Sequence, residues 1–201
     1  MFLSKVMLFG KFNRNLYEIH RALWQMFPKD ADAERDFLFR IERPGYRQSE
    51  ILMQSIRQPT SQKTNIKLIA TRNYDLSLKD EQRLRFLLVA NPVKKINDEK
   101  GRENTKGEIK KCRVPLFAEA QQRLWIERKL EHNAQLEALV ITSNPPFYFR
   151  KTGVTKAGKI QPVSFQGTLK VKKPNVLKEM IAKGIGPAKA FGCGLMSVAR
   201  A

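Results

Sequence analysis

Apolar and polar positions in the first ninety residues predict a strand, a helix and then further strands. Residues 2–9 are apolar with one interruption at Lys5, as expected for a strand. Residues 16–27 carry apolar side chains at helical spacing, and Pro28 ends that pattern. Asn15 followed by Glu18 gives the capping-box signature of a helix start.

The next segments have the character of strands and turns. Residues 36–42 and 50–57 are predicted strands separated by Pro44-Gly45, and residues 83–90 are a further strand closed by Asn91-Pro92. Residues 58–65 are polar and fit either a loop or a short helix, while residues 66–79 are expected to be extended in part. The order β-α-β-β-(x)-β is that of a ferredoxin-like unit.

The second half repeats this order less regularly. Residues 97–110 predict a flexible charged loop, Pro115 begins a helix that runs to Leu130, and residues 135–142 are a strand. Residues 147–149 and 160–171 flank a predicted hairpin tip, after which come a short helix at 174–183 and a last strand from Leu195. We therefore expect an α+β fold with two tandem ferredoxin-like (RRM-like, βαββαβ) domains, residues 1–92 and 93–201.

A glycine-rich loop lies between that last helix and the last strand. Gly184, Gly186, Gly192 and Gly194 flank Lys189 in two G-x-G pairs. Such a loop can present backbone N–H groups and one ammonium to a phosphate. Its spacing differs from the dinucleotide and nucleoside-triphosphate motifs. The alternative is a purely structural helix cap followed by a bulge.

Net charge narrows the class of partner. A formal charge of +19 and a pI near 10.2 favour a polyanion, first of all nucleic acid. A membrane surface is the weaker candidate, because no basic amphipathic helix, polybasic tail or apolar run of bilayer length stands out. The N-terminal residues 1–9 fit a strand better than a signal peptide. Cys112 and Cys193 lack metal-ligand spacing, so reduced thiols and a cytoplasmic location are expected.

The positive charge is unevenly distributed. Residues 138–178 contain eight Lys or Arg and no Asp or Glu. The predicted hairpin carries Arg150, Lys151, Lys156 and Lys159 beside aromatic residues, which favours contact with a phosphate backbone over a merely solubilising surface. A second basic group at 94–113, which includes Arg113, is diluted by acidic residues.

The first predicted helix carries the candidate chemistry. Tyr17, His20 and Arg21 lie along one rim of it. An early helix position in a strongly basic chain should lower the pKa of His20 and keep the imidazole neutral, as a general base requires. The alternative is a packed or solvent-exposed histidine, as expected for His132. The sequence has no convincing carboxylate pair, Cys/His pair or nucleoside-triphosphate-binding loop, so we expect no metal or cofactor. An RNA substrate would supply its own nucleophile, the 2′-hydroxyl group.

Several segments, taken together, resemble one family. The chain is similar to the CasE family, the CRISPR precursor-RNA endoribonucleases of type I-E (Cascade) systems, in the segments Leu16–His20, Leu23–Pro28, Arg35–Phe39, Ala90–Pro92, Lys111–Leu116 and Gly184–Gly194. The resemblance implies tandem ferredoxin-like domains and metal-independent cleavage at the base of the CRISPR repeat hairpin. It further implies 2′-hydroxyl attack and an enzyme that stays on its product as a Cascade subunit, with other Cascade subunits as partners.

The resemblance also assigns residues. The family's tyrosine and histidine match Tyr17 and His20, which makes these the expected catalytic pair, with the roles of base and acid left open. Its glycine-rich loop matches 184–194, and its basic hairpin corresponds to 150–159. The expected RNA-binding residues are Arg21, Arg113, Arg150, Lys151, Lys156, Lys159, Gly184, Gly186, Lys189, Gly192 and Gly194. The loop 97–110 receives no role.

Two other functions compete with cleavage. Ferredoxin-like folds often bind RNA without cutting it, so a non-catalytic structured-RNA-binding protein is the main alternative. The stacking signature of the ordinary single-strand RNA-recognition module is absent from the sequence, however. A basic DNA-binding or ribosomal-type protein is the third possibility.

Overall fold

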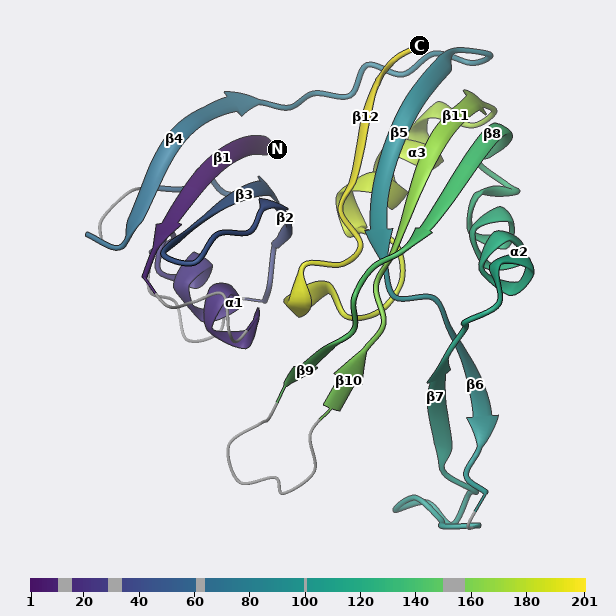
Figure 1. Cartoon of the computed structure of the whole chain (residues 1–201). Helices are drawn as coiled ribbons and strands as arrows, with labels where there is room; N and C mark the ends of the chain where they lie inside the picture. Colours follow the sequence, from purple (N-terminus) through teal and green to yellow (C-terminus); the bar gives the residue numbers. More distant parts are fainter. Residues whose placement is uncertain (11–15, 29–33, 61–63, 100, 150–157) are drawn as a thin grey trace.

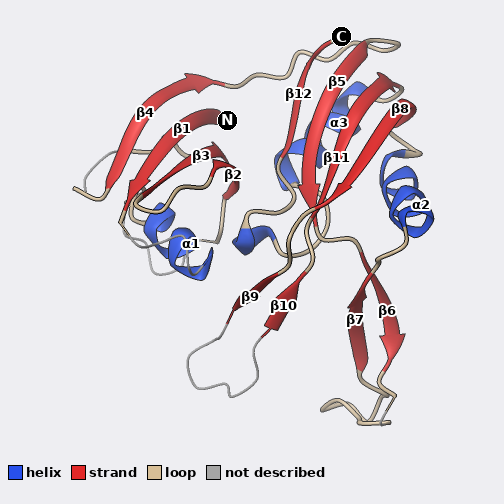
Figure 2. Ribbon diagram, in the orientation of Figure 1, coloured by secondary structure: helices blue, strands red, loops and turns tan. Residues whose placement is uncertain are grey.

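The protein was analysed as a computed structural model, which describes residues 1–10, 16–28, 34–60, 64–99, 101–149 and 158–201. Within these residues the strands form two four-stranded sheets and two short hairpins (Figures 1 and 2). The predicted α+β fold with two ferredoxin-like units is confirmed. None of the described helices is long and apolar enough to cross a bilayer.

The first sheet has the order β2-β3-β1-β4 and is antiparallel throughout. Its elements are β1 (Phe2–Phe9), α1 (Leu16–Trp24), β2 (Phe37–Arg43), β3 (Gln48–Ser55) and β4 (Ile66–Asn73). Helix α1 buries Ile19 and Leu23 against Val6, Phe39 and Ile51 of the sheet. The order is that of a ferredoxin-like sheet, but the described residues between β3 and β4 contain no second helix, in agreement with a loop there.

The second sheet has the order β12-β5-β11-β8, which is again the ferredoxin-like order. Its strands are β5 (Arg83–Ala90), β8 (Ala134–Ser143), β11 (Val163–Val171) and β12 (Met196–Arg200). Helices α2 (Glu119–Leu130) and α3 (Pro174–Lys183) supply Trp125, Ile126, Leu177 and Ile181 to the core under this sheet.

One strand belongs to a different sheet from the one predicted. Residues 83–90 are a strand, as expected, but this strand pairs with β11 and β12 and not with the first sheet. Strand β4, in the segment read as ambiguous, occupies the expected place beside β1. The alternation of apolar and polar residues predicts a strand and its buried face but does not identify the strand it pairs with, which explains this error. The division into two domains remains a prediction, and sheet membership favours a boundary between β4 and β5.

The connection after β5 is also more ordered than expected. Strands β6 (Val93–Asn97) and β7 (Lys111–Pro115) pair as an antiparallel hairpin that extends away from the second sheet (Figure 1). Its tip is held by an ion pair between Asp98 and Arg102 and by a bridge between Glu103 and Ile109. The predicted flexible loop is therefore the outer end of a hairpin, and α2 begins at Glu119 and not at Pro115.

Candidate nucleic-acid interface and active site

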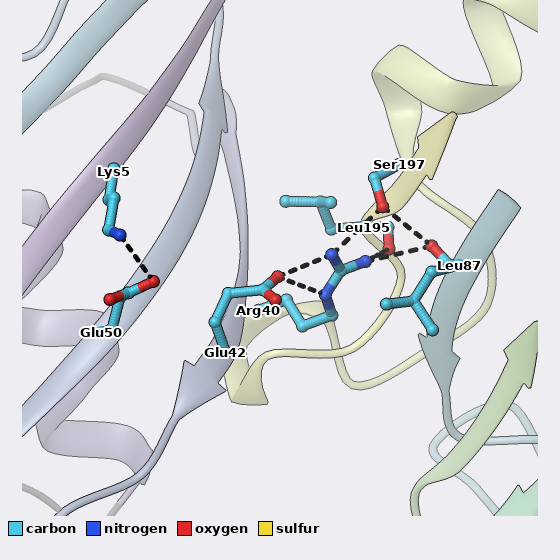
Figure 3. A network of polar contacts seen from close by, with 7 residues as sticks. All are labelled: Lys5, Arg40, Glu42, Glu50, Leu87, Leu195 and Ser197. Atoms are coloured by element: carbon cyan, nitrogen blue, oxygen red, sulfur yellow. Dashed lines mark hydrogen bonds and ion pairs between the residues drawn. The ribbon is translucent and has the colours of Figure 1, made fainter. Parts of the chain in front are cut away.

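The two units are joined through a buried arginine on β2. Arg40 is only 4% exposed and forms an ion pair with Glu42. Its guanidinium also donates to the Leu87 carbonyl oxygen at 3.0 Å, the Leu195 carbonyl oxygen at 3.4 Å and Ser197 Oγ at 3.1 Å (Figure 3). These acceptors belong to β5, to the end of the glycine-rich loop and to β12, so one side chain fixes the first sheet against the second.

A second connection runs from β3 to the end of α3. The Gln54 side-chain amide donates to the carbonyl oxygens of Ile181 at 3.2 Å and Ala182 at 3.3 Å. The glycine-rich loop starts at the next turn, and Gly194 N–H at its far end donates to the Val89 carbonyl oxygen at 2.7 Å. Both ends of the loop are therefore anchored where the two units meet.

His20 lies on α1 over the aromatic edge of the first sheet. Its ring centroid is 5.5 Å from that of Phe37 and 6.5 Å from that of Phe39, and Trp24 meets it edge-on at 6.3 Å. Burial among these rings, with a smaller contribution from the cation of Arg35, lowers the pKa of His20 to about 4. The imidazole is therefore neutral at pH 7. Its Nε2 atom is buried and has no hydrogen-bond partner among the described residues.

This environment explains why the predicted lowering of the pKa is confirmed, although by a different cause. The expected cause was the position in the helix and the overall positive charge. The main cause in the structure is burial under Phe37 and Phe39, which belong to a strand distant in sequence. Tyr17 lies one turn before His20 and is 37% exposed. Arg21 forms an exposed ion pair with Glu18 at 3.3 Å.

The glycine-rich loop folds back toward α1 and contains the short 3-10 helix η2 (Lys189–Phe191). η2 packs against both α1 and β2. The Lys189 ammonium donates to the Lys183 carbonyl oxygen at 2.5 Å, and burial together with the cation of Arg35 lowers the pKa of Lys189. Lys189 and His20 thus approach the same cation, Arg35, from different units of the fold.

A cleft of about 680 Å³ opens beside η2. Of the described residues, five cationic side chains and no carboxylate line it; the cations are Arg35, Lys95, Arg113, Lys129 and Lys189. The rest of the lining is Val93, Trp125, Gly186, Pro187, Ala188, Ala190 and Phe191. Such a surface suits a phosphate backbone, because cations from several elements converge with no acidic side chain to neutralise them.

The cleft gathers only some of the expected RNA-binding residues. Arg113, Gly186 and Lys189 line it, whereas Arg21 lies on the exposed rim of α1. Arg35 and Lys129 were not singled out from the sequence, and Lys95 was named only as part of the second basic group, because each lies in a segment of mixed charge. Only the tertiary fold brings them together. Arg150, Lys151 and Lys156 lie outside the described residues, as does the proposed N-cap Asn15.

Lys159 belongs to the predicted hairpin, which the structure confirms. Strands β9 (Phe147–Phe149) and β10 (Gly158–Ile160) pair antiparallel, with Lys159 opposite Tyr148. The ring of Phe149 packs against that of Phe191 of η2, tilted by 40° with 4.3 Å between the ring centroids, so the base of the hairpin contacts the glycine-rich loop. The Lys159 ammonium lies 5.8 Å from the Phe117 ring centroid and 5.9 Å from that of Tyr148.

The glycines have structural roles that the sequence reading underestimated. The backbone conformation at Gly192 and Gly194 disfavours a Cβ. Gly192 has φ 78° and a Cβ there would lie 3.3 Å from Phe39, the aromatic floor under His20; Gly194 has φ 95° and would meet the Ile185 carbonyl oxygen at 3.0 Å. Gly184 is the C-cap of α3, as the structural alternative required. Contact of these glycines with RNA remains a prediction.

The second histidine and the two cysteines do not suggest a different catalytic site. His132 is exposed and pairs only with its neighbour Glu131, as expected. Cys193 is buried, which raises the pKa of its thiol to about 12, and Cys112 is a free thiol on β7. Among the described residues, no three His, Cys, Asp or Glu side chains lie together as metal ligands would.

Comparison with known proteins identifies the family. The family model described as "CRISPR associated protein" matches residues 1–200. The Cascade subunit CasE of Escherichia coli K12 is 42% identical over 200 residues, which are 99% of each chain. The chain belongs to the CasE family.

Two CasE relatives have solved structures with the same fold. The crystal structure of Cas6e from E. coli K-12 aligns over 100% of both chains with a TM-score of 0.84 and 40% identity. The CRISPR-associated endoribonuclease Cse3 of Thermus thermophilus is 30% identical over 201 residues, 92% of this chain and 90% of Cse3. Cse3 bound to an RNA representing a pre-cleavage complex aligns over 99% of this chain and 100% of Cse3, with a TM-score of 0.75 and 26% identity.

Proposed function

We propose that this protein is an endoribonuclease that cleaves the repeat hairpins of CRISPR precursor RNA and remains bound to the product as a subunit of Cascade. The observation that carries the proposal is a neutral imidazole on α1, whose buried Nε2 atom has no partner among the described residues, together with a cleft lined by five cations beside η2, which packs against α1. Support comes from the relatives, of which one is named a Cascade subunit and the other an endoribonuclease.

In the proposed reaction, the 2′-oxygen of the nucleotide before the scissile bond attacks phosphorus as the bond to the 5′-oxygen breaks. The 2′-hydroxyl proton passes to a base, and the 5′-oxygen receives a proton from an acid. The products are a 2′,3′-cyclic phosphate, or the 3′-phosphate derived from it, and a 5′-hydroxyl. No water need be activated, so the reaction needs no metal.

We assign the role of base to His20 and that of acid or positioning group to Tyr17. Neutral imidazole can accept a proton, and the anionic phosphate would raise its low pKa toward neutrality on binding. Tyr17, one turn away on the exposed rim, can reach the other side of the same phosphate. The cleft residues and Lys159 would hold the neighbouring phosphates.

The proposal places the protein in the cytoplasm. Its thiols are free, and processing would occur where the precursor RNA is made. Its partners are then repeat-hairpin RNA and the other Cascade subunits, without a membrane.

The test is incubation of the protein with a labelled repeat hairpin, the same hairpin with one 2′-deoxy nucleotide before the scissile phosphate, and the matching DNA. We expect cleavage of the RNA alone, and cleavage should persist in excess chelator. Binding of the deoxy hairpin should be nearly unchanged, since only the nucleophile is missing. An intact RNA hairpin with tight binding would identify a non-catalytic RNA-binding protein, and preference for duplex DNA would identify the third class.

A further inference from the structure

Arg35 lies where two clefts of the structure meet. It lines the cleft beside η2 and also a second cleft of about 640 Å³ between the start of β2 and the end of α3. Lys189 is the other residue that lines both. Arg35 directly precedes Asp36 and Phe37, and Phe37 is one of the rings packed on His20.

Packing between three parts of the chain brings the elements that carry three such groups together. His20 comes from α1, Arg35 from the segment before β2, and Lys189 from η2, which packs against both elements. The cation of Arg35 contributes to the lowered pKa of His20 and of Lys189, which is consistent with its lying close to both. The uncharged groups packed on His20 are the rings of Phe37, Phe39 and Trp24, with Tyr17 one turn away.

The guanidinium of Arg35 is available to a ligand. Arg35 as a whole residue is exposed, while partial burial lowers the pKa of its guanidinium; this group makes no hydrogen bond or ion pair with any residue that the structure describes. Two carboxylates flank Arg35 in the sequence, Glu34 and Asp36. Asp36 is held by Arg57 through two hydrogen bonds of 2.7 and 3.0 Å, so Arg57 occupies one of the two.

The chemistry of the proposed cleavage calls for such a group. As the 2′-oxygen attacks, phosphorus becomes bonded to five oxygens and negative charge grows on the two non-bridging oxygens. A guanidinium presents parallel N–H donors that match two oxygens on one phosphorus, whereas an ammonium acts as a point charge. Donors aimed at charge that develops only in the transition state accelerate the reaction.

We propose that Arg35 is a catalytic residue, in addition to Tyr17 and His20: it binds the non-bridging oxygens of the scissile phosphate beside His20 and stabilises the five-coordinate transition state. This inference rests on the proposed function. In the step, the bond from the 2′-oxygen to phosphorus forms and the bond to the 5′-oxygen breaks. His20 takes the 2′-hydroxyl proton; Arg35 donates hydrogen bonds and exchanges no proton.

The first test compares Arg35→Gln, Arg35→Lys and the control Arg128→Gln in single-turnover cleavage at saturating protein. Arg128 is an exposed arginine on α2 that lines neither cleft. Arg35→Gln should slow cleavage by about 10²–10³-fold, the usual effect of losing one transition-state donor. Arg35→Lys should recover only part of the rate, and Arg128→Gln should match the wild type. A normal rate in Arg35→Gln would overturn the inference while leaving the proposed function standing.

The second test asks whether Arg35 touches the reacting phosphate. Each non-bridging oxygen of the scissile phosphate is replaced in turn by sulfur, and the two diastereomers are cleaved separately. The wild type should discriminate between them, because a guanidinium bonds sulfur more weakly than oxygen. Arg35→Gln should lose most of that discrimination. Discrimination equal to that of the wild type would mean that Arg35 acts elsewhere.

The third test needs no cleavage. NMR titration of His20 in the RNA-free protein should give a higher pKa in Arg35→Gln than the wild-type value of about 4, since a nearby cation is removed, and no change in Arg128→Gln. An unchanged His20 pKa would place Arg35 away from His20 and overturn the inference whatever the substrate. If the wild type failed to cleave any RNA, both the proposed function and the catalytic role of Arg35 would be wrong. A higher pKa of His20 in Arg35→Gln would then show only that Arg35 and His20 are neighbours.

Discussion

The two four-stranded sheets share one strand order but contribute different things to the site. The first unit has α1 as its described helix and provides His20, made neutral by burial against its own β2. The second unit has two helices, two hairpins and the glycine-rich loop, and it provides Lys95, Arg113, Lys129 and Lys189. We therefore propose that the first unit provides the proton-transfer group and the second unit provides most of the cations that bind the RNA.

The comparison also shows why the join between the units matters. Arg35 and Arg40 are five residues apart, just before β2 and within it. Arg35 lines a cleft. Arg40 is enclosed by Glu42 and by hydrogen-bond acceptors of the second unit. A small rotation at this join would separate His20 from Lys189. The predictions below change one side of the comparison at a time.

The largest effect is expected from the histidine of the first unit. His20→Ala should lower the single-turnover cleavage rate by about 10²–10⁴-fold with RNA affinity nearly intact, the usual contribution of a positioned proton-transfer group. Tyr17→Phe should cost less. His132→Ala, which changes the exposed histidine of the second unit, is the matched control and should cleave normally. Equal losses for both histidines would remove the proposed division of labour.

The second-largest effect is expected from a variant that removes the contacts of Arg40 between the two units. Arg40→Met removes the guanidinium that donates to the Leu87 and Leu195 carbonyl oxygens and pairs with Glu42, and should lower the free energy of unfolding by about 3–5 kcal/mol, measured by denaturant titration. The control is Lys5→Met, since Lys5 forms a half-exposed pair with Glu50 within the first sheet (Figure 3). That pair should contribute no more than about 1 kcal/mol. Similar losses in both variants would mean that the contacts across the join carry no special weight.

A glycine of the second unit should show a smaller effect. Gly184 has φ 76° and ψ 152°, a region open almost only to glycine, and a Cβ there would lie 2.7 Å from Leu38 of the first unit. Gly184→Ala should therefore cost about 1–3 kcal/mol of folding free energy. Gly107→Ala is the control, because Gly107 also has positive φ, 73°, but no atom lies within 4 Å of its Cβ position. If Gly107→Ala proved equally costly, backbone strain and not contact between the units would explain the loss at Gly184.

The last prediction concerns acid. The folded-state pKa of His20, about 4, lies below its ordinary value of 6.5, so the unfolded chain binds more protons between these values. Stability from this group is complete above pH 6.5 and falls as the pH drops toward 4. The difference in unfolding free energy between wild type and His20→Gln, measured by denaturant titration at several pH values, should shift in this window. A flat difference for His20 would mean that its imidazole is already hydrated in the folded protein.

Most of the local structure followed from the sequence. The strand at 2–9, the helix from residue 16, the helix at 174–183 and the last strand were all predicted, because each combines a clear period with a Pro or Gly boundary. Strands β6 and β7 were missed, since short charged strands of an exposed hairpin have no apolar alternation to reveal them. The pairing of β5 was wrong for a related reason: alternation gives the face of a strand, not its partner.

For the site, the sequence by itself determined the residue types: one candidate histidine on a helix rim, a glycine-rich loop and an excess of positive charge. The tertiary structure decided how they meet. Phe37 and Phe39 set the pKa of His20, and Arg35, Lys95 and Lys129 joined the cleft from segments of mixed charge. It also gave Gly192 and Gly194 positive φ angles and close neighbours that disfavour a Cβ. Burial, pKa and convergence depend on contacts between residues far apart in the chain, and periodicity and composition carry no record of those contacts.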